Sequence, residues 1–288
     1  MRKINFLGKI AGAMLLAAPL VSNAQIKTPA PSPAASITQS FGLTEVTVDY
    51  SRPGVKNRTV FGDLVPFGEL WRFGANSSTK IEFADDVKIN GKDVKKGMYA
   101  LYAIPGKTEW EMVLHTNTTY GGTGDAAKHP EDDALRFKVP VMKSPMLIES
   151  FTIAFGNVKD NSADMMVMWE NTMLSFTITQ DIDTKIMASI EKTLNPTPAA
   201  NDYNAAATFL HTNGKDLNQA LTYVNKAIEL NPKAFWMIHN KAKIQKDLKD
   251  YNGAVKTAEL SKKVAIEEDY KPYIKMNDDL IADVKKMM

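Results

Sequence analysis

Alternating apolar and polar residues dominate the chain between residues 36 and 180. In the segment TEVTVDYS, Val46, Val48 and Tyr50 fall on one side of an extended chain, while Thr47 and Asp49 fall on the other. Similar runs lie at 44–51, 80–83, 98–104, 109–115, 135–141, 148–155, 165–169 and 173–179. Glycine, proline, asparagine or aspartate separates most of them, as is typical of turns between strands.

No helical period interrupts these runs. The pattern therefore predicts a mainly β domain over residues 36–180, built as an antiparallel β-sandwich or jelly roll. The run MMVMW at 165–169 is apolar at every position. We expect it to form a central strand that is covered on both faces.

The hydrophobic period changes near Asp181. The segment DIDTKIMASIEKTL predicts a helix or helical turn, and NPTPAA then interrupts it, so residues 181–200 are expected to be a linker. Residues 201–288 follow a helical period. The clearest stripe of small and apolar residues is Leu217, Ala220, Leu221, Val224, Ala227 and Ile228.

The helical part repeats itself. The motif KDLNQAL begins at Lys215 and KDYNGAV begins at Lys249, 34 residues later. This period, with small residues where helices approach and Pro232 closing the first unit, resembles the tetratricopeptide repeat over residues 201–268. The resemblance implies paired helices that bind a protein or peptide partner. The second unit is degenerate because Ile266 replaces its proline, and 272–288 should form a capping helix, with Ile274, Leu280, Ile281 and Val284 on its inner side.

The first 24 residues have the features of a secretory signal. Arg2, Lys3 and Lys9 form a cationic start, residues 10–21 form an apolar core, and small residues precede a predicted cleavage between Ala24 and Gln25. The apolar run is too short to span a bilayer comfortably. We expect an exported protein, periplasmic or extracellular, whose mature chain has no transmembrane segment. Residues 25–35 contain three prolines and should form a tether.

The charge and composition of the chain exclude or disfavour several classes of function. The formal net charge of +2 includes the three positive residues of the signal, so the mature chain carries −1. No long basic block occurs, which argues against nucleic acid as a partner. The chain has no cysteine. Disulfides, thiolate nucleophiles and cysteine metal sites are therefore excluded, and stability must come from a packed core.

The stretch LWRFGANSST at 70–79 gathers the strongest candidate chemistry. Together with a nearby loop it supplies Tyr50, Arg52, Trp71, Arg72 and Asn76. In one interpretation these residues bind an anionic or polyhydroxylated ligand, with the arginines as bidentate donors and an aromatic ring as a stacking platform. In the other, Trp71 anchors a long loop in the core while Arg72 and Asn76 satisfy buried carbonyl groups. The pattern favours the structural interpretation without excluding the first.

The same region carries a family resemblance. The motifs YSRP at 50–53, FGxLVPxG at 61–68 and WRxGAN at 71–76 resemble an uncharacterised family of secreted bacterial proteins, domain of unknown function 2911, over residues 32–179. Its members often carry an acidic residue after the asparagine, where this chain has Ser77 and Ser78. The resemblance implies export and a β domain, and it assigns no activity.

Other motifs give little support for chemistry. The four histidines lack metal-ligand spacing, the acidic turns 131–133 and 160–164 match no calcium loop, and GGTGD at 121–125 lacks the lysine of a phosphate-binding loop. We therefore expect no metal and no cofactor. No GxSxG motif supports a hydrolase. The sequence favours a non-enzymatic envelope binding protein; the alternative is an enzyme that uses the polar loops around Arg52, Arg72 and Asn76.

Overall fold

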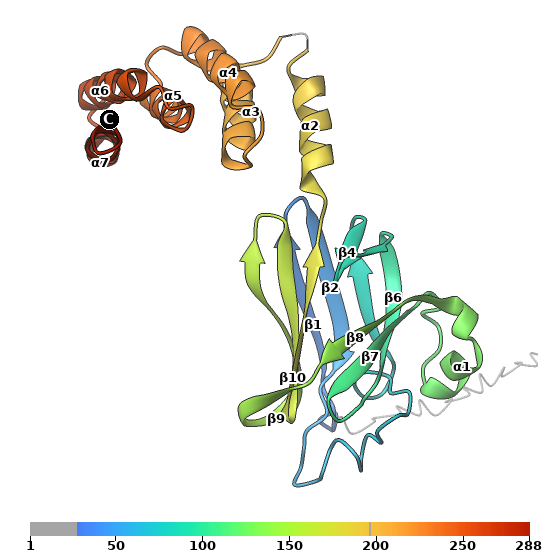
Figure 1. The fold of residues 1–288 in the computed structure, drawn as a ribbon. Coiled ribbons are helices and arrows are strands. Elements are labelled where there is room, and N and C mark those ends of the chain that lie inside the picture. Colours follow the sequence, from blue (N-terminus) through green and yellow to red (C-terminus); the bar gives the residue numbers. More distant parts are fainter. Residues whose placement is uncertain (1–27, 196) are drawn as a thin grey trace, which may run out of the picture.

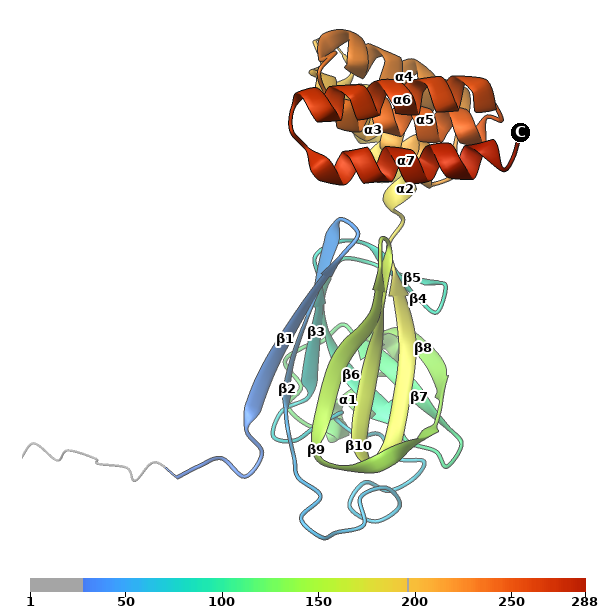
Figure 2. The same cartoon turned by 90° about the vertical axis from the view of Figure 1, so that its left-hand side faces the viewer.

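The computed structural model describes residues 28–195 and 197–288 (Figures 1 and 2). The signal predicted at 1–24, with its cleavage between Ala24 and Gln25, lies outside these residues. Antiparallel β-sheets form the first part of the described chain and helices form the second, as the hydrophobic periods predicted. Within the described residues, none of the helices combines the length and hydropathy needed to cross a membrane.

A six-stranded antiparallel sheet forms one layer, in the order β1-β2-β3-β6-β7-β8. Its strands are β1 (Ala34–Phe41), β2 (Thr44–Ser51), β3 (Thr79–Phe83), β6 (Gly97–Ile104), β7 (Glu109–His115) and β8 (Asp133–Pro140). In β2, the apolar residues predicted to share a face are all buried, while Asp49 is exposed. The period of two therefore fixes which side of each strand enters the core.

The second sheet has four strands in the order β5-β4-β10-β9. They are β4 (Val87–Ile89), β5 (Lys92–Val94), β9 (Met142–Lys159) and β10 (Ser162–Thr179). The runs predicted at 165–169 and 173–179 belong to one strand, β10. Its pairing with β9 shifts register on both sides of Glu170, which has φ of +54°. This irregularity kinks the strand without ending it.

The run MMVMW differs from its predicted burial. It lies in a central strand, but only Met165, Val167 and Trp169 are buried, whereas Met166 and Met168 are half-buried on the other face. The prediction that both faces are covered is therefore wrong. Methionine has a flexible, polarisable side chain that tolerates a partly exposed site, so its presence does not identify the buried face.

One hydrophobic core takes residues from both sheets. Its aromatic centre comprises Phe61, Trp71, Phe73, Trp110, Phe151 and Trp169. The rings of Trp71 and Trp169 are stacked, with centroids 5.8 Å apart. Most other pairs meet edge to face, the arrangement favoured by the ring quadrupoles. The long connection between β2 and β3 is thereby held in the core by its own aromatic residues.

A smaller apolar cluster lies on the opposite side of the six-stranded sheet. It contains Ala100, Tyr102, Val113 and Ala126. The last belongs to the short helix α1 (Thr123–Lys128), which lies beside β6 and β7 (Figure 1). The segment between β7 and β8 thus covers the outer face of these two strands.

Six helices follow the sheets: α2 (Ile182–Thr193), α3 (Ala200–Thr212), α4 (Leu217–Leu230), α5 (Phe235–Asp247), α6 (Tyr251–Glu267) and α7 (Lys271–Lys285). Helix α2 leaves the end of β10, and α3 to α7 pack side by side (Figure 2). Asp216 and Asp250, the aspartates of the repeated KD motif, cap α4 and α6 by accepting backbone N–H groups. The repeat therefore marks two equivalent helix starts.

The residues predicted to form the inner side of the last helix are less exposed than most of its other residues, but only one of them is fully buried. Val284 is buried, but Ile274, Leu280 and Ile281 are only half-buried. The other buried residue is Asn277, whose amide donates to Ser261 Oγ at 2.9 Å and to Tyr273 O at 2.7 Å. A polar network, which a search for apolar positions misses, thus joins α6 and α7.

Candidate functional site

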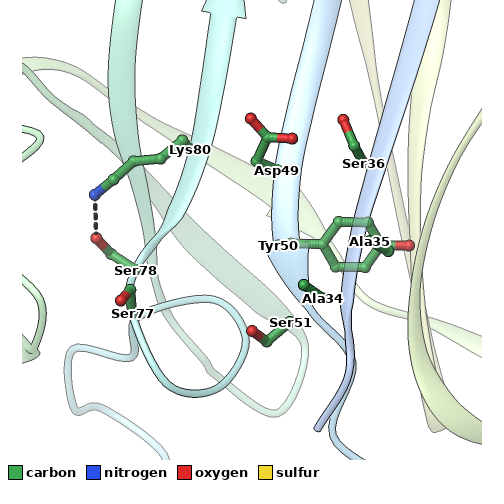
Figure 3. Close-up of a pocket in the computed structure, with 9 residues that line it drawn as sticks. All are labelled: Ala34, Ala35, Ser36, Asp49, Tyr50, Ser51, Ser77, Ser78 and Lys80. Atoms are coloured by element: carbon green, nitrogen blue, oxygen red, sulfur yellow. Dashed lines mark hydrogen bonds between the residues drawn. The ribbon is translucent and has the colours of Figure 1, made fainter. Parts of the chain in front are cut away.

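An open groove of about 480 Å³ lies on the outer face of β1, β2 and β3 (Figure 3). Its lining residues are Ala34, Ala35, Ser36, Asp49, Tyr50, Ser51, Ser77, Ser78 and Lys80. Most of these side chains are small, and several carry hydroxyl groups. The groove therefore combines space with hydrogen-bonding groups.

Sheet pairing brings the groove residues together. Ser36 is opposite Asp49 between β1 and β2, and Asp49 is opposite Lys80 between β2 and β3. These residues form one row across the outer face, because side chains of paired residues point to the same side. Ser51, opposite Ala34, occupies the next row. Strand pairing thus makes neighbours of Asp49 and Lys80, which are 31 positions apart in the chain.

The segment that covers β6 and β7 is bonded to Ser78, one of the residues that line the groove. Ser78 Oγ donates a hydrogen bond to Tyr120 O at 2.9 Å, which fastens this segment to the start of β3. Tyr102 Oη lies 3.3 Å from both Tyr120 O and Gly122 O. This segment therefore covers the outer face of the six-stranded sheet at β6 and β7. The groove lies beside it, on the outer face of β1, β2 and β3.

Lys80 provides the cation of the groove. Its Nζ donates to Ser78 Oγ at 2.6 Å, and its side chain extends away from Asp49 (Figure 3). Partial burial lowers the pKa of the Lys80 ammonium below its ordinary value, because desolvation disfavours the charged form. Among the described residues, no carboxylate pairs with Lys80 to offset this lowering of its pKa.

Two of the five predicted ligand residues face the core or an adjoining strand. The Tyr50 ring packs edge to face on Phe151, and its hydroxyl accepts from Ile153 N at 3.2 Å. Arg52 Nε donates to Phe151 O at 3.1 Å, and its Nη2 donates to Thr152 Oγ1 at 2.8 Å. Tyr50 connects β2 to β9, and Arg52 connects the residue after β2 to β9. Tyr50 borders the groove without directing its hydroxyl into it.

Trp71 is an anchor of the β2–β3 connection. Only 9% of the residue is exposed, and its indole Nε1 donates to Gly74 O at 3.1 Å. The indole ring lies within the aromatic centre of the core. It offers no open face for stacking on a ligand.

Arg72 and Asn76 have different surroundings. The Nε of Arg72 is buried, and no residue in the described ranges accepts a hydrogen bond from it. Asn76 is exposed, has φ of +60°, and donates from Nδ2 to Ser51 Oγ at 3.1 Å and to Ser32 O at 3.2 Å. Asn76 thus adjoins the groove through Ser51, whereas neither arginine lines the groove.

The sequence did not single out Asp49 or Lys80, and it treated Ser78 only as a departure from the family pattern. Ser78 and Lys80 lie next to the motif GAN, but nothing local distinguishes them from ordinary strand residues. Their relation to Asp49 depends on the register between β2 and β3. Periodicity predicted the face of each strand, and pairing over long range created the site.

No cluster in the described residues suggests a metal site. Across residues 28–195 and 197–288, no three histidine or acidic side chains are grouped to hold an ion. The ring nitrogens of His115 lie 3.2 Å from Asn117 O and from His129 O. This histidine bonds to the backbone of the covering segment.

Comparison with known proteins gives one match. A family model described as "Protein of unknown function (DUF2911)" matches residues 32–178, which span both sheets. No curated protein matches the chain. No solved structure matches it either.

Proposed function

Because the chain belongs to DUF2911, a family of unknown function whose match ends at the last strand, we propose a function from its geometry. We propose that it is an exported, non-enzymatic binding protein of the cell envelope. In this proposal, the β part holds a small polar ligand and the helices engage a protein or peptide.

The features of residues 1–24 support export. A cationic start, an apolar core and the small residues before Gln25 are the three parts of a secretory signal. Because the chain has no cysteine, its folding needs no disulfide bond and does not depend on the redox state of the compartment. We propose the periplasm or the extracellular space as the location.

We propose a β-sandwich for the first part and degenerate tetratricopeptide repeats for the second. Support for the sandwich is the single core to which both antiparallel sheets contribute. Support for the repeats is that α4 begins at Leu217 and α6 begins at Tyr251, 34 residues later, each after a capping aspartate.

The observation that carries ligand binding is the relation between Lys80 and Asp49. Opposite charges on adjacent strands face one groove, yet the Lys80 ammonium bonds to Ser78 instead of Asp49. Surface strands commonly pair such charges, since opposite charges directly across a sheet stabilise it. A cation and an anion kept apart in a groove are available to a ligand.

The bonds made by the predicted polar loops argue against the enzyme alternative. The side chains of Arg52 and Asn76 are already bonded to the protein, and Arg52 points to β9. A catalytic site needs groups that converge on one reacting atom. The described residues around Arg52, Arg72 and Asn76 offer no such convergence.

Exposed apolar and basic side chains support a partner for the helices. Leu260 and Ile266 on α6 are 50% and 55% exposed. Two grooves of about 580 and 490 Å³, one along α5 and α6 and one along α6 and α7, share Glu259 and Lys263. Apolar side chains within a polar rim are a common composition of protein-binding surfaces.

Native mass spectrometry tests the ligand part. The full chain, expressed with its N-terminal segment, is purified from the envelope fraction of its host without denaturation. We expect a chain that begins at Gln25 and carries a small-molecule adduct. The adduct should be lost in Lys80→Met and kept in Lys107→Met, which removes an exposed lysine outside the groove. A chain that begins at Met1, or an adduct indifferent to Lys80, would contradict the proposal.

A pull-down tests the partner part. The full mature chain and a variant with Leu260→Asp and Ile266→Asp are used as baits in envelope extract. We expect the wild-type chain to retain a protein that the variant releases. Equal retention by both baits would rule out this face of α6 as the partner surface.

A further inference from the structure

The groove contains one cation, Lys80, and one anion, Asp49, from directly opposite positions on adjacent strands. We infer that its ligand is a small monocarboxylate that also carries hydroxyl or ammonium groups, with the carboxylate on Lys80 and the donor groups on Asp49. This inference rests on the proposed ligand-binding function of the β part and specifies its chemistry.

The hydrogen bonds of Ser78 hold the cation in place. The single hydroxyl proton of Ser78 goes to Tyr120 O, so Ser78 Oγ is left to accept a bond from Lys80 Nζ. An ammonium group has three donors. One of them is used on Ser78, and the others remain for a ligand. Because Ser78 is buried and fastened to the covering segment, Lys80 is oriented before any ligand arrives.

Desolvation favours an anion at this position. Part of the water shell of Lys80 is replaced by protein, which destabilises its charge. A carboxylate beside Nζ would restore that stabilisation through a charge-assisted hydrogen bond. The ligand should therefore raise the lowered pKa of Lys80.

Asp49 sets the second requirement. Asp49 is directly opposite Lys80 across β2 and β3 and lines the same groove, so a ligand that extends along the groove from Lys80 Nζ meets the Asp49 carboxylate. An ionised carboxylate only accepts hydrogen bonds. It therefore favours a ligand with hydroxyl or ammonium donors, and it repels a second negative charge. Inorganic phosphate, whose dianion is one of its two main species near neutral pH, should bind less well than a monocarboxylate.

The dimensions of the groove fit this class. A volume of about 480 Å³ lies within the range of about 300–1,000 Å³ usual for small-molecule sites. Ala34, Ser36 and Ser51 provide space, and Ser36, Ser51 and Ser77 provide further hydroxyls. The opening to solvent suits a polar molecule more than an apolar one.

Titration of the full mature chain with defined probes tests the inference. Gluconate and glycine each carry a carboxylate and donors; acetate lacks donors, glucose lacks the carboxylate, and phosphate supplies a dianion. Calorimetry gives each Kd. The side-chain ¹³Cε signals of the ¹³C-labelled, chemically unmodified lysines, with the Lys80 signal assigned by its absence in Lys80→Met, give the pKa of Lys80 with and without each probe.

We expect gluconate, glycine or both to bind and to raise the Lys80 pKa, with acetate, glucose and phosphate at least about tenfold weaker. Lys80→Met and Asp49→Asn should each weaken binding by about tenfold or more, and Lys107→Met should leave it unchanged. Unchanged melting temperatures would show that the variants remain folded. Gluconate carries hydroxyl donors and glycine carries an ammonium donor, so their Kd values show which kind of donor the groove binds more tightly.

Three results would overturn the inference, and the first and third of them would leave the proposed ligand-binding function intact. A native adduct that depends on Lys80 but is neutral or a phosphate would preserve ligand binding and refute the monocarboxylate class. Failure of all five probes to shift the Lys80 signal, with no Lys80-dependent native adduct, would refute both. Binding of gluconate or glycine that is unaffected by Asp49→Asn would also refute the assigned geometry.

Discussion

Nδ1 of His239 on α5 lies 2.8 Å from Oδ1 of Asn277 on α7, and both side chains are buried. Asn277 also donates to Ser261 on α6, whose hydroxyl donates to Phe235 O on α5. One amide thus connects three helices through a continuous polar network. Such a network stabilises a unique packing only while every member keeps its partner.

Removal of the Asn277 amide should destabilise the helical part. Asn277→Ala leaves the buried His239 ring and Ser261 hydroxyl without their partner, which typically costs about 1–3 kcal/mol. Urea unfolding followed by the far-ultraviolet helical signal measures the change. The matched control is Asp279→Ala on the same helix, which breaks an exposed pair with Lys275 and should cost less than about 0.5 kcal/mol. Equal losses in both variants would exclude the network as the cause.

His239 should make the stability of the helices depend on pH. Burial lowers its pKa below the ordinary value of 6.5; Lys243 acts in the same direction, and the bond to Asn277 opposes them. Between the lowered pKa and 6.5, the unfolded chain binds more protons than the folded one. Stability is therefore full above pH 6.5 and falls as the pH drops through this window.

The His239 prediction is tested by comparing how steeply stability changes with pH in the wild type and in a variant. Urea midpoints of the wild type and of His239→Gln are compared between about pH 7.5 and 5. The variant should lose less stability on acidification. The pair of His211 with Asp247 is present in both proteins, so its contribution cancels in the comparison. Parallel slopes would mean that His239 does not contribute.

Arg52 and Arg72 should differ although both were candidate ligand residues. Arg52→Ala removes two hydrogen bonds from the end of the β2 segment to β9, with an expected cost of about 1–3 kcal/mol. Arg72→Ala removes an Nε that makes no bond within the described residues, so it should cost less. Thermal unfolding of the two variants compares them directly. A larger loss for Arg72 would restore the interpretation that it satisfies buried carbonyl groups.

Truncation of Trp71 should have the largest effect in the β part. Trp71→Ala removes the ring that contacts Phe61, Phe73, Trp110 and Trp169, which leaves a cavity at an expected cost of about 3–5 kcal/mol. Trp236→Ala is the control, because Trp236 is 38% exposed on α5. Near-ultraviolet circular dichroism and thermal unfolding report the loss. A cost of Trp71→Ala no greater than the control would show that the core relaxes around the gap.

The sequence alone determined the class of each segment and the inward side of most strands. In β2, alternation placed Val46, Val48 and Tyr50 in the core because successive side chains point to opposite faces. The repeated KD motif marked two helix starts because an aspartate at such a position can cap the free N–H groups. These features are local, so a short stretch of sequence carries them.

Tertiary structure decided the site and the polar contacts. Asp49 and Lys80 become neighbours through the register of β2 with β3, and Ser78 is fixed by Tyr120 from a later loop. Asn277 is buried because His239 and Ser261 meet it from two other helices. Each contact joins residues from separate elements, and a polar side chain shows no period that reveals its partner. Packing over long range, which local patterns do not encode, therefore determined where the groove and the buried polar contacts lie.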